Sequence, residues 1–340
     1  MFSRYLQSLF TILCTAILLW LGKSFLVPLT YAILISFVLY PVTKKLENKG
    51  FHKVFSIIIP IILLCLVFSG LVSLLIFELI SLRSKWPMVQ QQMDPFLENL
   101  SLILEKEYGW TTEKQLEWLR NSFTSASQDL AAYLQNSVES TIKALFHLLI
   151  IPIYISLILL YRKKLVDFTI RIVPVAYKDR FPEVIRDTVQ IFSRFVRGIM
   201  MVYIIVGILN GLGLWALGVD NPFIYGMISA VMTVIPYIGI MISALLPITV
   251  TWLETASFLQ PVGIIIVFIT VQYLEANLIF PYVVGRFVHL NTLVTIIAMM
   301  IGGLIWGVAG MILFVPLLAI FRVISKHYPE LKTWEDFLGN

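Results

Sequence analysis

Residues 223–253 read FIYGMISAVMTVIPYIGIMISALLPITVTWL and contain no charged side chain. A membrane-spanning helix needs about 20 apolar residues, because the hydrocarbon core is about 30 Å thick and each helical residue rises about 1.5 Å. This stretch is longer than one straight crossing requires, and Ile235-Pro236-Tyr237-Ile238-Gly239 interrupts it near its middle. Proline removes a backbone hydrogen bond and glycine frees the turn. The stretch is therefore either one kinked span or two half-helices.

The last apolar stretch, residues 293–321, is over-long in the same way. Straight spans through both stretches would put Arg286 outside, whereas hairpins that enter and leave on one side put it in the cytoplasm with Arg322 and Lys326. Because cytoplasmic loops are rich in lysine and arginine, the charge pattern favours hairpins. The interruption in this second stretch consists of glycines, namely Gly302, Gly303, Gly307 and Gly310.

Two such hairpins would enter the membrane from opposite faces, with their tips meeting near the midplane. Irregular backbone at that depth is tolerated only where it is buried in protein or lines a wet cavity. Paired interrupted segments are also the best sequence pointer to the binding site of a transporter. The sequence therefore predicts a solute site at the two interruptions.

The composition of the whole chain agrees with a membrane protein. Of its 340 residues, 59% are hydrophobic and 13% are charged, whereas globular domains have about 45–50% apolar and about 25% charged residues. The predicted fold class is all-α, a polytopic membrane protein with about eight membrane segments, two of them re-entrant helical hairpins. Besides the two interrupted stretches, the predicted spans are residues 5–22, 25–42, 54–80, 144–161, 198–217 and 262–280.

Charge divides the chain into regions and gives their orientation. Residues 162–197 carry nine basic side chains against four acidic ones, which marks them as cytoplasmic together with the lysine-rich loop at 44–53. Both termini are then cytoplasmic, and a polar helical insert is outside, with Asp94-Pro95 as a helix start. The predicted regions are 1–80 with three spans, 81–143 as the insert, 144–197 as the fourth span and a basic amphipathic segment, 198–324 as a transport core, and 325–340 as a cytoplasmic tail.

Glu275 is the most unusual residue of the membrane segments, because it lies near the centre of the span at 262–280. A carboxylate there costs several kcal/mol unless it is paired, hydrated or protonated, so Glu275 is a candidate for binding a coupling proton. Gln272 lies on the same helical face, while Asn277 points elsewhere. Asn210 lies between two glycines and is expected to form a hydrogen bond between packed helices. Arg286 is a candidate structural partner of Glu275.

The sequence lacks the patterns that are typical of metal sites, disulfide frameworks, nucleotide sites and catalytic sites. The two cysteines lie in apolar runs and the four histidines are scattered, so neither a metal site nor a disulfide framework is expected. Gly22-Lys23-Ser24 ends like a phosphate-binding loop, but position 17 is Ile rather than the required Gly. No cofactor, nucleotide or nucleic acid is expected. An enzyme is disfavoured because no nucleophile–base set or aspartate pair lies in the spans.

The interrupted segments resemble the autoinducer-2 exporter family. The resemblance rests on IPYIG at 235–239, QYLEAN at 272–277, PYVVGR at 281–286, GG at 302–303 and GVAG at 307–310, followed by Pro316. It implies a multi-pass protein of the bacterial cytoplasmic membrane, assembled as a homo-oligomer, a pentamer. The site that it implies is lined by Pro236, Tyr237, Gly239, Gln272, Glu275, Asn277 and the Gly302–Gly310 turn.

Taken together, these observations predict a secondary transporter that exports a small polar metabolite or signalling molecule such as autoinducer-2, with hairpin gates and proton coupling. Similar families are associated with export of that signal, with cation/proton exchange, or with sporulation. A monovalent cation/proton antiporter is therefore one alternative. A membrane scaffold that transports nothing and binds a partner through its external insert is another.

Overall fold

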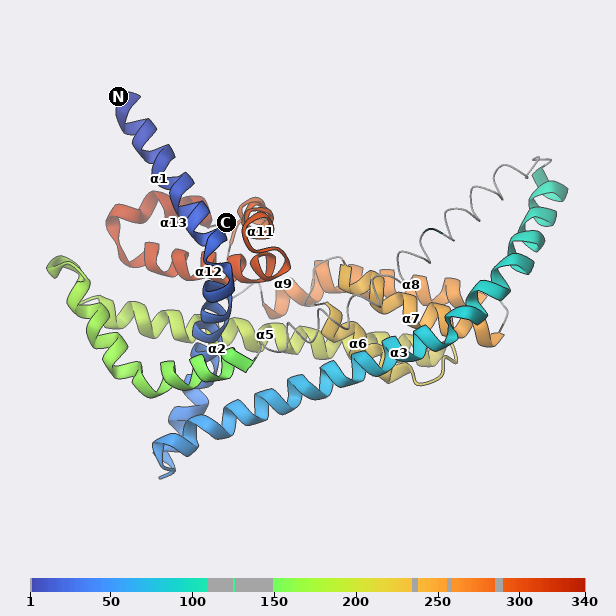
Figure 1. Cartoon of the computed structure of the whole chain (residues 1–340), viewed down its shortest axis with the longest axis horizontal. Coiled ribbons are helices and arrows are strands. Elements are labelled where there is room, and N and C mark those ends of the chain that lie inside the picture. The colour runs from blue at the N-terminus through green and yellow to red at the C-terminus, as the bar shows by residue number, and fades with distance from the viewer. Residues whose placement is uncertain are drawn as a thin grey trace. The chain divides into compact units, whose positions relative to one another are not determined.

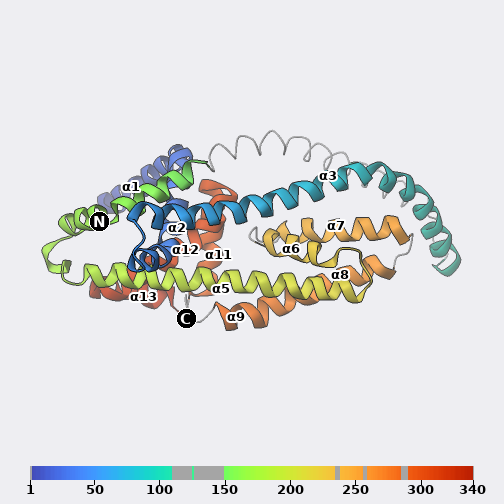
Figure 2. The same ribbon diagram turned by 90° about the horizontal axis from the view of Figure 1, so that it is seen from below.

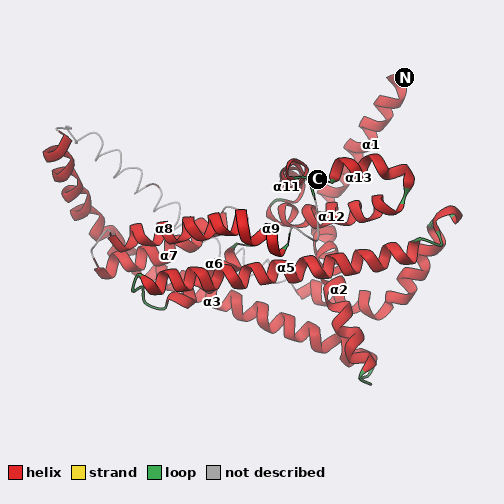
Figure 3. Cartoon of the chain, turned by 180° about the vertical axis from the view of Figure 1, so that it is seen from behind, coloured by secondary structure: helices red, strands yellow, loops and turns green. Residues whose placement is uncertain are grey.

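The computed structural model describes residues 2–108, 125, 149–233, 238–255, 259–284 and 290–339. Within these ranges the regular structure is helical and contains no strand, as the red ribbons of Figure 3 show. The prediction of an all-α polytopic membrane protein is confirmed. Helices in the described ranges that are long and apolar enough to cross a membrane cover Lys23–Asn48, Lys53–Ser73, Phe181–Ala216, Leu259–Val283 and Val308–His327.

The chain forms two compact units. Unit 1 contains Met1–Val67, His147–Val202 and Glu275–Asn340, and unit 2 contains Phe68–Phe146 and Tyr203–Leu274. Glu275 and the glycines of the second interrupted stretch therefore belong to unit 1. The first interrupted stretch belongs to unit 2.

The first two helices, α1 (Phe2–Leu21) and α2 (Lys23–Asn48), follow one another without a loop (Figure 1). Helical hydrogen bonds bridge the junction, because the Gly22 amide donates to the Leu18 carbonyl at 2.9 Å and the Leu26 amide donates to the Gly22 carbonyl at 2.8 Å. Two separate crossings at 5–22 and 25–42 would need a reversal here, and the structure has only a bend. The cytoplasmic N-terminus depended on that reversal and stays a prediction.

In unit 1, α2 packs against the beginning of α3 (Lys53–Tyr108) and against a helix at 149–172. Their shared core consists of aliphatic side chains. It contains Ala32, Leu39, Ile57, Ile61, Ile155 and Leu159.

Charged contacts close one end of this three-helix core. Lys53 donates from Nζ to the Leu160 carbonyl at 2.8 Å, and Arg162 forms an ion pair with Glu47. The lysine-rich turn after α2 and the basic residues that begin at Arg162 therefore lie at the same end of unit 1, as the charge pattern predicts.

At two positions where the sequence predicted a boundary between segments, the structure has an uninterrupted helix. The expected helix start at Asp94-Pro95 is wrong, because α3 is one uninterrupted ribbon through this pair (Figure 2). Proline removes a single hydrogen bond, and a long helix continues when the bonds on either side remain. Similarly, α5 (Phe181–Ala216) passes through position 197, where the amphipathic segment was expected to end and a span to begin.

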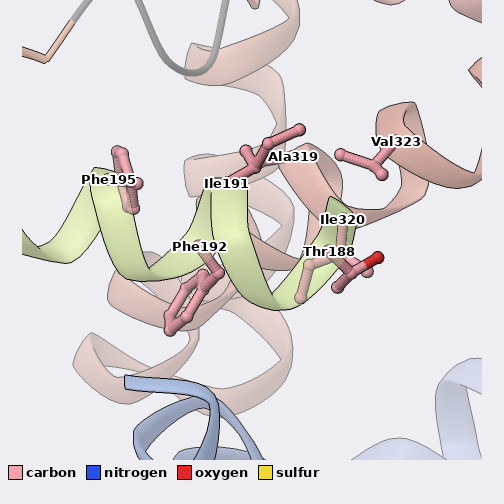
Figure 4. A pocket seen from close by; sticks show the side chains of 7 residues that line it. All are labelled: Thr188, Ile191, Phe192, Phe195, Ala319, Ile320 and Val323. Atoms are coloured by element: carbon pink, nitrogen blue, oxygen red, sulfur yellow. The ribbon is translucent and has the colours of Figure 1, made fainter. Parts of the chain in front are cut away.

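The first half of α5 packs on α12 (Val308–His327) along an apolar seam. The crevice between them has a volume of about 10 Å³ (Figure 4), which is about the space of one water molecule. It is therefore a packing seam and too small for a solute. Its lining is Thr188, Ile191, Phe192 and Phe195 from α5, with Ala319, Ile320 and Val323 from α12.

The first interrupted stretch forms two helices in unit 2, α6 (Pro222–Met232) and α7 (Ile238–Thr255). The predicted interruption is thus confirmed, although Pro236 and Tyr237 lie outside the described residues. α7 packs on α6 and on α8 (Leu259–Leu274). Gly239 permits the close approach of α7 to α6, since a Cβ atom there would lie 1.7 Å from the Met232 carbonyl oxygen.

The second interrupted stretch also forms two helices, α11 (Thr292–Trp306) and α12, both in unit 1. Gly307 separates them with φ +63° and ψ −144°, in a region of backbone conformation that favours glycine. α12 then packs back on α11 with the backbones in contact. A Cβ atom on Gly310 would lie 1.9 Å from the Gly302 carbonyl oxygen, and one on Gly302 would lie 2.4 Å from the Gly310 carbonyl oxygen. The predicted interruption is confirmed, while re-entry from one membrane face stays a prediction.

The predicted C-terminal tail is folded onto unit 1. After α12, the chain forms η3 (Pro329–Leu331) and α13 (Lys332–Leu338). The Asn291 amide donates to the Leu338 carbonyl at 2.9 Å, which joins the end of α13 to the start of α11.

The beginning of the tail contacts the residues just before α5. The rings of Tyr177 and Tyr328 meet edge to face at 4.8 Å. The Tyr177 hydroxyl also donates to the Glu330 carboxylate, which raises the pKa of Tyr177. The pKa of Glu330 is lowered by a backbone hydrogen bond, by the bond from Tyr177 and by nearby Arg180.

The glycine crossing of α11 and α12 gives a stability prediction. Gly310→Ala should destabilise the protein by about 1–3 kcal/mol, because the new methyl group overlaps backbone that cannot move away easily. Gly70→Ala in α3 is the matched control, since its Cβ atom would meet no described atom within 4 Å. It should leave stability unchanged or raise it by up to about 1 kcal/mol. Thermal unfolding in detergent measures both variants, and equal melting temperatures would contradict the crossing.

The contact between Tyr177 and Glu330 gives a pH prediction. Because the pKa of Glu330 is lowered in the folded protein, its carboxylate stabilises the docked tail at pH values above about 4.3, the pKa of an unfolded glutamate. This stabilisation is lost as the pH falls from there through the lowered pKa of the folded state. A spin label at Asp336, which is exposed in α13, should therefore become more mobile at pH 3 than at pH 7.

Tyr177→Phe should reduce this pH response, whereas the exposed Tyr161→Phe should leave it unchanged. If the label is equally mobile at both pH values in the unsubstituted chain, the proposed role of Glu330 in docking is wrong.

Candidate functional site

The helix that carries Glu275 changes its winding at that residue. α8 ends at Leu274, a π-helical turn η2 (Glu275–Ile279) follows, and α9 (Phe280–Val283) continues the span. Pro281 supplies a local reason, because it lacks the N–H that would bond to the Asn277 carbonyl in an α-helix. Single π turns inside α-helices are frequent at functional sites.

Glu275 is buried within this turn, with 7% of its surface exposed. Its Oε2 atom has no hydrogen-bond partner among the described residues. Val271 and Ile279, one turn before and after it, are also buried, so the carboxylate lies on an apolar helical face. A buried polar atom without a partner is costly and calls for a bound proton, water or ligand.

The other polar residues of this span are arranged as the helical periodicity predicts. Gln272 is half-buried, and Asn277 is exposed and faces away from Glu275. Gln272 is therefore the amide side chain that lies on the same partly buried helical face as Glu275. Arg286, the candidate partner of Glu275, lies outside the described residues.

Asn210 forms the cross-helix hydrogen bond expected of a packing residue. In unit 2 its Nδ2 donates to Ser229 Oγ at 2.9 Å, and that hydroxyl donates to the Gly226 carbonyl at 2.8 Å. Gly226 permits this contact of α6 with α5, since a Cβ atom on it would lie 2.3 Å from the Gly207 carbonyl oxygen. The bond fixes two helices to each other, and Asn210 Oδ1 is buried as well, with no hydrogen-bond partner among the described residues.

A pocket of about 400 Å³ lies in unit 1 beside the turn at Gly307. Trp306 and Ala309 line it from the two sides of that turn, and α2 forms the opposite wall. The Trp306 indole is held in place, because its Nε1 donates to the Leu19 carbonyl at 2.9 Å and its ring contacts Phe314 edge to face at 5.5 Å. The pocket volume is within the range of about 300–1,000 Å³ that small-molecule sites have.

Sequence reasoning found the two helix interruptions and the buried carboxylate but missed this pocket. Its wall on α2 consists of Lys23, Ser24, Val27, Pro28 and Tyr31. The available signal was Lys23 itself, a cation between two apolar stretches with no acidic residue near it in sequence.

In unit 1 the described residues thus bring together a helix turn at Gly307 with a pocket beside it, and they separately bury one carboxylate at a π turn. A carboxylate in apolar surroundings can bind and release a proton or a monovalent cation. Among the described residues, no group of three or more His, Cys, Asp or Glu side chains could hold a metal ion.

Comparison with known proteins covers nearly the whole chain. The family described as "AI-2E family transporter" matches residues 9–330. A Bacillus subtilis (strain 168) protein with the name "Putative transport protein YrrI" is 28% identical over 328 residues, which cover 92% of this chain and 88% of that protein. A second protein of that strain, YueF, is 25% identical over 87% of this chain and 82% of its own length.

A third relative carries a name with a substrate. The "AI-2 transport protein TqsA" of Escherichia coli (strain K12) is 29% identical over 122 residues, which cover 35% of each chain. The predicted resemblance is thereby confirmed, and it extends from the first helix to the beginning of the folded tail. Since the family match spans residues 9–330 of 340, the chain belongs to the AI-2E family of transporters.

Proposed function

We propose that this protein is a proton-coupled secondary transporter that exports a small polar solute, with Glu275 as the group that binds the coupling proton. The observation that carries the proposal is the buried Glu275 carboxylate, whose Oε2 has no described partner, at a π turn of a spanning helix. Family membership supports the transport role. The identity of the solute, the direction of transport and the coupling ion go beyond family membership and belong to the proposal.

The coupling role follows from the cost of the charge. A carboxylate on an apolar face inside the membrane is costly when ionised, so it holds a proton until water or a cation reaches it. A conformational change that exposes Glu275 to one side of the membrane and then to the other would move one proton per cycle.

The helix interruptions supply the moving parts in this proposal. α12 packs on α11 with backbones in contact at Gly302 and Gly310 and with the Trp306 ring against Phe314, so a displacement of α11 would shift the turn at Gly307 together with α12. Gly239, Pro236 and Tyr237 would contribute in the same way from the first interruption. A polar solute would be held by Gln272 together with backbone groups freed at the interruptions, whereas Asn277, which the family resemblance also implies, lies on another face of the helix.

The proposed setting is the bacterial cytoplasmic membrane, with the lysine-rich turn at 44–53 and the C-terminus in the cytoplasm and with copies of the chain assembled as a homo-oligomer. In this arrangement the region 198–324 is the transport core. A small hydroxyl-rich signal such as the substrate in the name of TqsA is the first solute to try, because amide and carboxylate groups suit hydroxyls.

Replacing Glu275 tests the coupling role. In proteoliposomes with a proton gradient, Glu275→Gln should reduce solute flux by at least about tenfold and abolish its dependence on pH, since an amide cannot exchange a proton at this site. Asp220→Asn is the matched control, because Asp220 is exposed in the connection between α5 and α6 and should be neutral. Unchanged pH dependence in Glu275→Gln would refute the proton role.

Additional arms of the same assay separate the alternatives. Uptake of Na⁺ that depends on Glu275, with no solute flux, would favour the monovalent cation/proton antiporter. A scaffold predicts a different result, since deletion of the insert at 81–143 would abolish all function, whereas a transporter should retain flux.

A further inference from the structure

The pocket beside Gly307 is lined by side chains that have no role in the proposed proton coupling at Glu275. One stripe of α2 faces it, with Ser24, Val27, Pro28 and Tyr31 at positions i, i+3, i+4 and i+7. Lys23 lies at the end of this stripe, and Ile151 from the neighbouring helix adds an apolar side chain. The pocket is thus apolar along most of its wall and cationic at one end.

The polar groups of this stripe have free capacity for hydrogen bonds. Neither the Ser24 nor the Tyr31 hydroxyl forms a hydrogen bond with another described residue. Pro28 has no N–H, so the Ser24 carbonyl lacks the partner that α-helix geometry would give it. A ligand with hydrogen-bonding groups near Lys23 would satisfy them.

Lys23 also lacks a countercharge among the described residues. Its ammonium group lies 5.4 Å from the centre of the Trp20 ring, a cation–π contact that orients the side chain without neutralising it. The acidic side chains with described ion pairs are Glu47, which pairs with Arg162, and Asp187, which pairs with His327. An anion is therefore a suitable partner for the exposed Lys23 ammonium group.

The position of Lys23 along α2 indicates where that anion comes from. Twenty-one residues separate Lys23 from Lys44, which corresponds to about 31 Å of helix and matches the hydrocarbon thickness of about 30 Å. Lys23 therefore lies at one membrane boundary when Lys44 lies at the other. At such a boundary, lipid headgroups supply anionic groups, and acyl chains continue from them along an apolar wall.

We propose that this pocket binds one anionic phospholipid. Its phosphate is held by Lys23 and the Ser24 hydroxyl, and its acyl chain lies along Val27, Pro28 and Ala309 toward the Gly307 turn. Because Trp306 and Ala309 flank that turn, the bound lipid contacts both helices that the turn joins. The inference does not depend on the role of Glu275, and its test needs no transport measurement.

The test uses the purified full chain in a neutral detergent, with thermal stability and native mass spectrometry as readouts. Phosphatidylglycerol should raise the melting temperature more than phosphatidylcholine does, and it should remain bound in the mass spectrum. Lys23→Gln should weaken phosphatidylglycerol binding by at least about fivefold, as expected for one lysine at an anionic headgroup. Lys44→Gln is the matched control and should bind as the unsubstituted chain does.

Ala309→Leu is a second variant that fills the pocket and keeps the charge of Lys23. It should weaken phosphatidylglycerol binding as well. Equal stabilisation by the two lipids, unchanged binding in Lys23→Gln, or an equal loss in Lys44→Gln would each overturn the proposal. Glycerol phosphate is the last compound tested. If this soluble anion raises the melting temperature as much as phosphatidylglycerol does, the pocket binds a soluble phosphate and the lipid proposal is wrong.

Discussion

Inside a lipid bilayer, each backbone N–H and C=O group needs a partner within the protein, and this constraint governs the whole structure. An uninterrupted helix meets it automatically. The present chain departs from that solution within its apolar segments, between α6 and α7, at η2 and at Gly307. In the proposed arrangement these departures lie within the bilayer, and the protein or water must then satisfy the backbone groups that they release.

At each departure, residue types lower the cost of the break. Gly239, Gly302 and Gly310 let backbones touch where a methyl group would overlap a carbonyl oxygen. Gly307 takes a positive φ that side chains disfavour. Near η2, Pro281 has already removed one donor, so a π turn there adds little further cost. The buried Glu275 lies at this same turn, which is why polar side chain and irregular backbone together mark the region for function.

The sequence predicted the interruptions at 235–239 and 302–310 because proline and glycine act locally, but it did not predict the π turn at η2. It pointed to Glu275 because a lone carboxylate contrasts with its apolar span. It did not predict that α1 continues into α2. Two apolar runs separated by Lys23-Ser24 are expected both for a bent helix and for two helices joined by a reversal of the chain. The helix through Asp94-Pro95 was missed because capping signals describe isolated helices, and a long helix overrides them. The pocket joins α2 to residues near 306, and no local pattern reveals a contact over such a separation in sequence.

The central claim is that the region around Glu275 is reached by water although it lies in a membrane span. Accessibility of a cysteine at position 272 to a hydrophilic maleimide tests it directly, in a chain whose Cys14 and Cys65 are replaced by serine. Gln272→Cys should react readily, because it is half-buried one helical turn from Glu275. Ile269→Cys, an exposed apolar position of the same helix, should react slowly because it faces lipid. Slow reaction at both positions would contradict the account.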